Sequence, residues 1–322
     1  MHPPPAAKVK QILYVTYLIV ALDVTWLFLQ FSITPYLAKR LGFDTLWFGY
    51  LQTTVGVIQL LGGPLFGRFA DIFGARAALS LSCLASVIYF LLLAAADSPL
   101  LLFLHKLPAV FMHALPAGSV FNLVEIVRLM KFPGVAKTFT VKIIAGLPSG
   151  VFQVMFSIIV MNFFQLQAEQ NGYLMAYLGV LQMVIQGGVI GRLTTRYSEN
   201  SLLLFSIGLN SLVGLAQALT TNMLQFCFVL IPMMLALSIF NVITDSMLTK
   251  SVPSSDTGTM LGLCASVLPL VRTIGPTIGG FLYETYGVTS LGYIQFTVSA
   301  ITFSLLFMSS TRGSNQPKMN LG

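Results

Sequence analysis

Long apolar runs follow one another along almost the whole chain, and charged residues fall mainly between them. Of the 322 residues, 56% are hydrophobic and 8% are charged, whereas soluble domains carry about 25% charged residues. A run of about 20 mostly apolar residues is long enough to cross a bilayer as a helix. We therefore predict an all-α polytopic membrane protein with about ten transmembrane helices, at 11–34, 45–67, 76–96, 100–119, 140–164, 172–192, 201–220, 223–248, 258–282 and 288–309.

The lysines and arginines between these runs predict the orientation in the membrane. With the amino terminus in the cytoplasm, nearly all of those in loops fall on the cytoplasmic side, and only Lys39 and Arg40 fall outside. This is the positive-inside pattern of membrane proteins. An even number of spans places both termini in the cytoplasm. We expect a multi-pass protein of the plasma membrane, with an intracellular membrane as the alternative.

Residues 119–139 interrupt the series with a different pattern. Apolar residues recur there at helical spacing, with Glu125, Arg128 and Lys131 between them. This pattern is typical of an amphipathic helix at the membrane surface. The predicted parts are an amino-terminal bundle of about four spans at 1–118, a cytoplasmic linker at 119–139, a six-helix bundle at 140–310 and a cytoplasmic tail at 311–322.

Two stretches of the chain resemble each other. Residues 49–76 read GYLQTTVGVIQLLGGPLFGRFADIFGAR, and residues 172–196 read GYLMAYLGVLQMVIQGGVIGRLTTR. A repeat at an offset of roughly 120 residues is too long for a solenoid unit and fits a transporter built from two homologous bundles. The positions that match at one fixed offset are Gly49/Gly172, Gly56/Gly179 and Gln59/Gln182.

The loop at 67–76, GRFADIFGAR, resembles the signature loop of the major facilitator superfamily, Gly-x-x-x-Asp-x-x-Gly-x-Arg/Lys. As in that family, it lies between the second and third spans. The resemblance implies a two-bundle architecture in which Gly67, Asp71, Gly74 and Arg76 form a conformational latch. A tight polar turn is the simpler interpretation of the loop taken alone.

Further motifs narrow the resemblance. ALDVT at 21–25 resembles the first-span motif of drug:proton antiporters, and RTIGPTIGG at 272–280 resembles their Gly-Pro motif. NVITDSMLTK at 241–250 is similar to the organic-cation-transporter-like members of solute carrier family 22. The resemblance implies secondary active transport, as proton-coupled antiport of organic cations. It also implies helix packing through Gly275, Pro276, Gly279 and Gly280.

The chain departs from this family in length. Superfamily members have two halves of six spans each, but here the fourth run passes through LPA at 115–117 into GSVF at 118–121, which resembles the central cytoplasmic loop. Spans five and six are therefore expected to be absent, which leaves a four-plus-six arrangement. The alternative function is a shortened, transport-deficient isoform that acts as a membrane interaction or regulatory protein. A channel is a third possibility, disfavoured by the repeat.

Ionisable groups inside a bilayer are costly and are therefore functional candidates. Asp23, midway along the first run, is expected to bind a cationic substrate or the coupling proton, or else to bond to Thr25 or a neighbouring helix. Arg272 requires a partner, which can be Asp23, Asp245 or carbonyls freed by Pro276. Asp245 itself is expected to act as a latch.

The latch at Asp245 has two expected forms, a contact with Lys250 or a contact between bundles. In the fourth run, Lys106 and His113 are seven residues apart and would share a helix face. His113 facing a cavity would titrate near neutral pH, whereas Lys106 with its neighbour His105 would otherwise snorkel to the outer interface.

Gln59 and Gln182 are uncharged polar residues that either line the cavity or join helices. No phosphate loop, His-Glu-x-x-His, Gly-x-Ser-x-Gly or Cys-x-x-Cys motif occurs, so we expect no enzyme, no catalytic residue, no cofactor and no metal. The basic residues are scattered, which argues against nucleic acid. The expected partners are the lipid bilayer, small organic cations and protons; protein partners are not indicated.

Overall fold

Residues 25, 30, 33–112, 123–254 and 256–314 are described by the structure, a computed structural model, and most of them lie in helices. No strand occurs among these residues, which confirms the all-α prediction for this part of the chain. Seven helices in it are long and apolar enough to cross a membrane. They correspond to the predicted runs at 76–96, 140–164, 172–192, 201–220, 223–248, 258–282 and 288–309.

The described residues of the amino-terminal part contain one long helix and three short helical segments. A helical segment at 33–40 is followed by α2 (Thr45–Ala94), α3 (Pro99–Leu104) and the 3-10 helix η1 (Leu107–Phe111). The linker contains α4 (Leu123–Met130). The carboxy-terminal part contains α5 (Val135–Ile158), η2 (Ile159–Phe163), α6 (Ala168–Val184), η3 (Ile185–Ile190), α7 (Gly191–Arg196), α8 (Glu199–Leu219), α9 (Met223–Lys250), α10 (Thr257–Tyr286) and α11 (Val288–Ser314).

The helix α2 joins the second and third predicted spans. Asp44 caps its start, because the carboxylate accepts a hydrogen bond from the backbone N–H of Trp47 at 2.8 Å. At Gly74 the backbone leaves helical geometry, with φ 82° and ψ 163°, a region that favours glycine. The expected signature loop is thus a kink between two helices.

Three predicted spans are not among the seven. The run at 11–34 lies mostly outside the described residues. Residues 45–67 are helical within α2, but two glutamines, three threonines and several glycines lower the hydropathy of that stretch. In the run at 100–119, the described apolar helix Pro99–Phe111 is short and is interrupted before Pro108. The count of ten spans therefore stays a prediction.

The linker helix α4 is docked on the carboxy-terminal bundle. Its Leu129 is fully buried and belongs to one apolar cluster with Leu248 and Met260. Its Arg128 contacts the carboxylate of Asp256 at 2.7 Å. The helix was predicted from its amphipathic pattern, and its apolar face covers the ends of α9 and α10.

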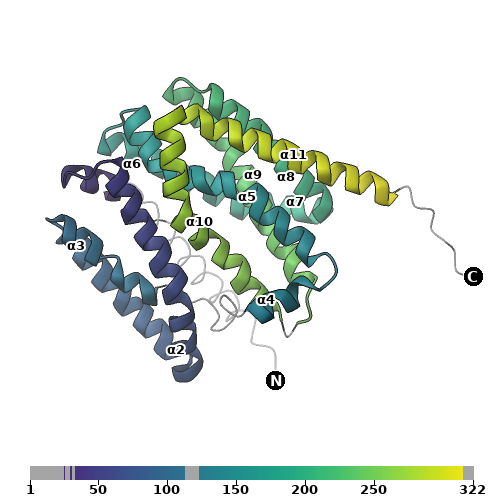
Figure 1. Cartoon of the computed structure of the whole chain (residues 1–322), viewed down its shortest axis with the longest axis horizontal. Coiled ribbons are helices and arrows are strands. Elements are labelled where there is room, and N and C mark those ends of the chain that lie inside the picture. Colours follow the sequence, from purple (N-terminus) through teal and green to yellow (C-terminus); the bar gives the residue numbers. More distant parts are fainter. Residues whose placement is uncertain (1–24, 26–29, 31–32, 113–122, 255, 315–322) are drawn as a thin grey trace, which may run out of the picture.

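The two parts of the chain share one core. Buried residues of a single cluster extend from Leu51 on α2 through Met155 on α5 to Leu230 on α9. In Figure 1, α2 and α3 lie on one side, α8 and α11 on the other, and α10 passes between α2 and α5. The helix α10 therefore connects the amino-terminal helices with the carboxy-terminal bundle.

Within that bundle, α8 and α11 approach each other closely. Gly214 and Gly292 make this possible, because an added Cβ on Gly214 would lie 2.6 Å from the backbone nitrogen of Phe296 and 2.9 Å from the carbonyl oxygen of Gly292. Lipid supplies no hydrophobic driving force between helices. Small residues at such crossings stabilise the pair because they let the two backbones pack closely.

Replacing Gly214 by alanine should destabilise the protein, since backbone atoms of α11 cannot turn aside as a side chain can. Overpacking costs about 1–3 kcal/mol, which exceeds the gain in helix propensity of up to about 1 kcal/mol. Thermal unfolding in detergent, followed by circular dichroism, should show a lower midpoint. Gly280→Ala on α10 is the control, because its Cβ would meet nothing within 4 Å. An equal fall in both variants would contradict the packing argument.

Candidate functional site

A small cavity lies where α2, α5, α10 and the segment around η1 meet. Its volume is about 70 Å³, room for a few water molecules, whereas sites for drug-sized ligands have about 300–1,000 Å³. Apolar side chains and a large set of polar ones form its walls. The polar residues are Gln30, Thr34, Gln52, Gln59, Tyr89, Lys106, Ser157 and Arg272.

Arg272 of α10 reaches across to α2. Its Nη1 donates a hydrogen bond to Oε1 of Gln59 at 3.0 Å, and Gln59 is buried with 5% of its surface exposed. The sequence had suggested a carboxylate or freed carbonyls as the partner. Among the described residues the observed partner is a neutral amide, and Asp245 of that expected set is engaged elsewhere. Asp23 lies outside the described residues, so its pairing with Arg272 stays a prediction.

The close approach of α2 and α10 sets up this contact. An added Cβ on Gly56 would lie 2.6 Å from the backbone nitrogen of Thr273. One turn earlier, the hydroxyl of Thr53 donates to the carbonyl oxygen of Thr273 at 3.3 Å. With the backbones this close, Gln59 and Arg272 face each other directly.

Lys106 enters the cavity from the other side. It is 2% exposed, and its Nζ donates to the hydroxyl of Tyr89 at 2.7 Å. The same ammonium lies 5.2 Å from the centre of the Tyr89 ring, within the range of a cation–π contact. Gln30 also donates to that hydroxyl through Nε2.

The expected snorkelling of His105 and Lys106 to the interface is therefore wrong for both residues. His105 is fully buried, with its ring 5.0 Å from that of Tyr89, and neither ring nitrogen has a hydrogen-bond partner among the described residues. The physical reason is the break between α3 and η1. It ends the helix at Leu104 and turns the next residues toward Tyr89.

The described wall of the cavity carries positive charge without a counterion. Lys106 and Arg272 are its charged residues, and none of the carboxylates that the structure describes lines it. Charges in a low-dielectric interior are costly unless they are compensated. The ion pairs among the described residues lie elsewhere: Arg128–Asp256, Lys142–Asp245 and Lys250–Glu199.

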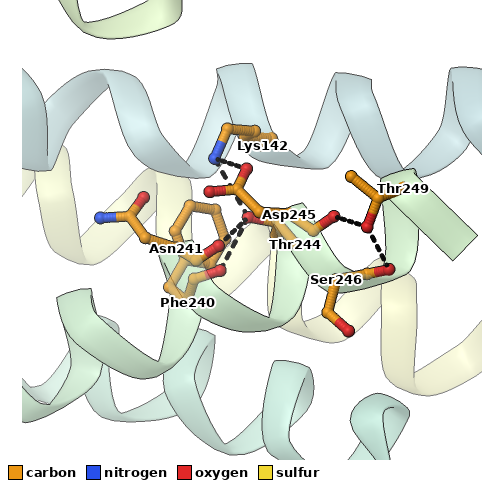
Figure 2. Close-up of polar contacts among 7 residues, drawn as sticks. All are labelled: Lys142, Phe240, Asn241, Thr244, Asp245, Ser246 and Thr249. Atoms are coloured by element: carbon orange, nitrogen blue, oxygen red, sulfur yellow. Dashed lines mark hydrogen bonds and ion pairs between the residues drawn. The ribbon is translucent and has the colours of Figure 1, made fainter. Parts of the chain in front are cut away.

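Asp245 forms a contact that the sequence did not predict. Its Oδ1 lies 2.9 Å from Nζ of Lys142 on α5, which also donates to the hydroxyl of Thr244 at 3.2 Å. Figure 2 shows this cluster between α5 and α9. The expected partner Lys250 instead contacts Glu199 at 2.7 Å. The Asp245 contact is therefore internal to the carboxy-terminal bundle, and neither expected form of the latch at Asp245 is observed.

The structure describes only some of the remaining predicted residues. Asp23 and His113 lie outside the described residues, so their roles stay predictions. In the signature segment, Arg76 is exposed, while Gly67 and Asp71 fall within helix α2 with side-chain surroundings that the structure does not describe. The latch role of the segment 67–76 is likewise untested.

The Gly-Pro motif on α10 packs against α5. Gly275, Pro276 and Gly279 are buried, and an added Cβ on Gly279 would lie 2.6 Å from Cγ of Met155. Gly280 faces away, with nothing within 4 Å of its Cβ position. Gln182 on α6 does not line the cavity, and its Oε1 has no hydrogen-bond partner among the described residues.

Tyr89 is the functional candidate that sequence reasoning missed. It lies in an apolar run where a single tyrosine is unremarkable. A polar stripe would have revealed it, because Ser82, Ser86 and Tyr89 recur at i, i+4 and i+7 and so share one helix face.

Comparisons with known proteins show clear similarity. A sequence profile described as the Major Facilitator Superfamily matches residues 138–320. Solute carrier family 22 member 18 of Rattus norvegicus is 44% identical over an alignment of 384 positions, which covers 92% of this chain and 93% of that protein. The Homo sapiens protein called solute carrier family 67 member A1 is 41% identical over 390 residues, 92% of each chain.

Solved structures share the fold. The crystal structure of the human organic anion transporter MFSD10 (TETRAN) aligns with a TM-score of 0.66 at 14% identity, covering 95% of this chain and 100% of that one. The nucleoside transporter NupG aligns with a TM-score of 0.58 at 14% identity, over 92% and 99% of the two chains. At these identities the likeness concerns the fold alone.

Replacing Lys142 by methionine should destabilise the protein, because it leaves the Asp245 carboxylate without its partner. The side chains are 7% and 39% exposed, so we expect a loss of about 1–3 kcal/mol, below the value for a fully buried pair. Thermal unfolding in detergent measures it, and adding Asp245→Asn should recover most of the loss. Lys250→Met, which removes an exposed pair with Glu199, should cost at most about 1 kcal/mol. Equal losses in the two lysine variants would contradict this account.

Proposed function

This chain belongs to the major facilitator superfamily, and from that premise we propose that it is a secondary active transporter of small organic solutes. The seven apolar helices in the part of the chain that the structure describes, together with the relatives, make it an integral, multi-pass membrane protein of a membrane-transport family. The observation that carries the proposal is the polar cavity at the contact between α2 and α10. Substrate sites of such transporters lie at the interface of the two halves.

The contacts across this interface suit a gate. The Gln59–Arg272 and Thr53–Thr273 hydrogen bonds join α2 to α10, and each is a single bond at 3.0 or 3.3 Å. Two bonds of this kind can break and form again as the halves rock against each other. Because the cavity holds only about 70 Å³, a substrate enters when the halves part.

The finer proposal is proton-coupled antiport of organic cations at the plasma membrane, with both termini in the cytoplasm. The antiporter-type motifs and the relatives support it by resemblance. Asp23 is the proposed proton site, because a carboxyl in an apolar span can take up and release a proton. The described wall supplies no carboxylate, so a cationic substrate would depend on Asp23.

A transport-deficient form is the second candidate, and two observations favour it. The alignment with the rat relative spans 384 positions although the chain has 322 residues, so it contains gaps in this chain. The second copy of the repeat also lacks the contact that the first copy makes. Gln59 of the first copy bonds to Arg272, whereas the buried Oε1 of the equivalent Gln182 has no partner among the described residues. Absent spans five and six would explain this missing partner.

Flux through proteoliposomes separates these two functions. The purified 322-residue chain is reconstituted beside the rat relative, and uptake of radiolabelled benzoate and benzylammonium is measured with and without an imposed pH gradient. We expect saturable uptake of at least one probe by this chain, at a rate well above that of empty vesicles. Uptake by the relative alone would establish the transport-deficient form instead.

Replacing Asp23 by asparagine should remove the response of this uptake to the pH gradient, because an amide cannot carry the coupling proton. We expect the gradient-driven component to fall at least tenfold, while exchange of labelled for unlabelled probe across the vesicle continues. Glu169→Gln, which neutralises an exposed carboxylate on α6, is the matched control. Undiminished gradient-driven uptake by Asp23→Asn would dismiss Asp23 as the proton site.

A further inference from the structure

The cavity is built for a negatively charged ligand. Resting on the transport function proposed above, we infer that its cargo is an organic anion, whose carboxylate head group binds between Arg272 and Lys106. This substrate class is opposite in charge to the organic cations of the finer proposal above, so the two are alternatives for the cargo of this cavity, and the probes described below decide between them. The inference rests on the two cations, their unused donors and the positions of the described carboxylates.

Each cation has donors to spare. A guanidinium offers five N–H donors, and one of those of Arg272 bonds to Gln59 among the described residues. An ammonium offers three, and Lys106 uses one on the hydroxyl of Tyr89. Carboxylates are the anions that such donors recognise best, since arginine binds them through two parallel hydrogen bonds.

The described carboxylates do not neutralise this site. Asp245, Glu199 and Asp256 are held in ion pairs with other lysines and arginines. The others whose side chains the structure describes are exposed and absent from the cavity wall: Asp44, Asp97, Glu169 and Glu284. No carboxylate among the described side chains therefore occupies the position of a counterion, and an anionic ligand can take it.

Electrostatics decides between the two substrate classes at this wall. A cationic ligand would bring a third positive charge to Lys106 and Arg272, which are already poorly solvated. Like charges repel strongly in a low-dielectric interior. An anionic ligand would supply the missing counterion and remove the cost of burying Lys106, which is 2% exposed. The anion is favoured by both effects together.

The rest of the wall suits the body of such a ligand. Val55 and Ala109, together with Pro35 and Met112, are apolar and line the same cavity. In its present volume of about 70 Å³ the cavity admits a group of carboxylate size. A larger organic anion would place its head group here and its apolar part against these side chains once the halves have moved apart.

Three probes of one shape and different charge test the inference: benzoate, benzylammonium and the neutral benzyl alcohol. The thermal unfolding midpoint of the detergent-purified full chain is followed as each probe is added, because a ligand that binds the folded state raises it. We expect a saturable rise with benzoate and none with benzylammonium. A rise with benzylammonium that equals or exceeds that with benzoate would overturn the inference, and so would the absence of any saturable rise.

Variants then locate the site. Arg272→Gln and Lys106→Met should each weaken the apparent affinity for benzoate about tenfold or more, which corresponds to the loss of about 1.4 kcal/mol. Arg272→Lys keeps the charge and should retain most of the affinity. Arg192→Gln removes an exposed positive charge on α7 and should leave it unchanged. Undiminished benzoate affinity in both charge-removing variants would place the anion elsewhere. If Lys106→Met does not fold, Arg272→Gln and its lysine counterpart decide the matter.

The binding and flux experiments test the anion site and the transport function independently of each other. Selective binding of benzoate without any saturable flux would support the anion site and contradict the transport proposal. Saturable flux of benzylammonium without benzoate binding would support transport and contradict the anion site.

Discussion

The contact of α2 with α10 at Gly56 is the constraint on which the rest of this structure depends. Glycine there lets the two backbones meet, with the Cβ position only 2.6 Å from the nitrogen of Thr273. That approach joins the amino-terminal helices to the carboxy-terminal bundle and sets Gln59 against Arg272. Since lipid drives helices together only weakly, close packing and interhelical hydrogen bonds must hold the halves. Under the proposed transport function, these interhelical hydrogen bonds break when the halves move apart.

The buried cations of this protein have two kinds of partner, a carboxylate or a neutral polar group. Lys142 is matched by the carboxylate of Asp245 and by Thr244, within one bundle. Lys106 and Arg272 meet neutral groups, a phenol and an amide, at the boundary between the halves. Removing one partner of a buried ion pair is costly, and a buried charge without a counterion is costly for the same reason. The first pair is structural, and we propose that the other two cations bind substrate.

The two copies of the internal repeat differ in their contacts with the rest of the protein. In its first copy, Gly56 and Gln59 are covered by α10. In the second copy, Oε1 of Gln182 has no partner among the described residues, and an added Cβ on Gly187 or Gly188 would meet nothing within 4 Å. The interhelical contact of the first copy is thus missing in the second.

The sequence by itself determined the class of protein and the helices of the carboxy-terminal part, and it singled out Gln59 and Arg272 as candidates, because apolar length, periodicity and buried charge are local signals. It also placed the amphipathic helix of the linker, now α4. It did not determine which groups would meet. The break before Pro108 turned Lys106 inward to Tyr89, and Lys142 took the carboxylate expected for Lys250. Those pairings join residues distant in the chain, so only the packing of the helices decided them.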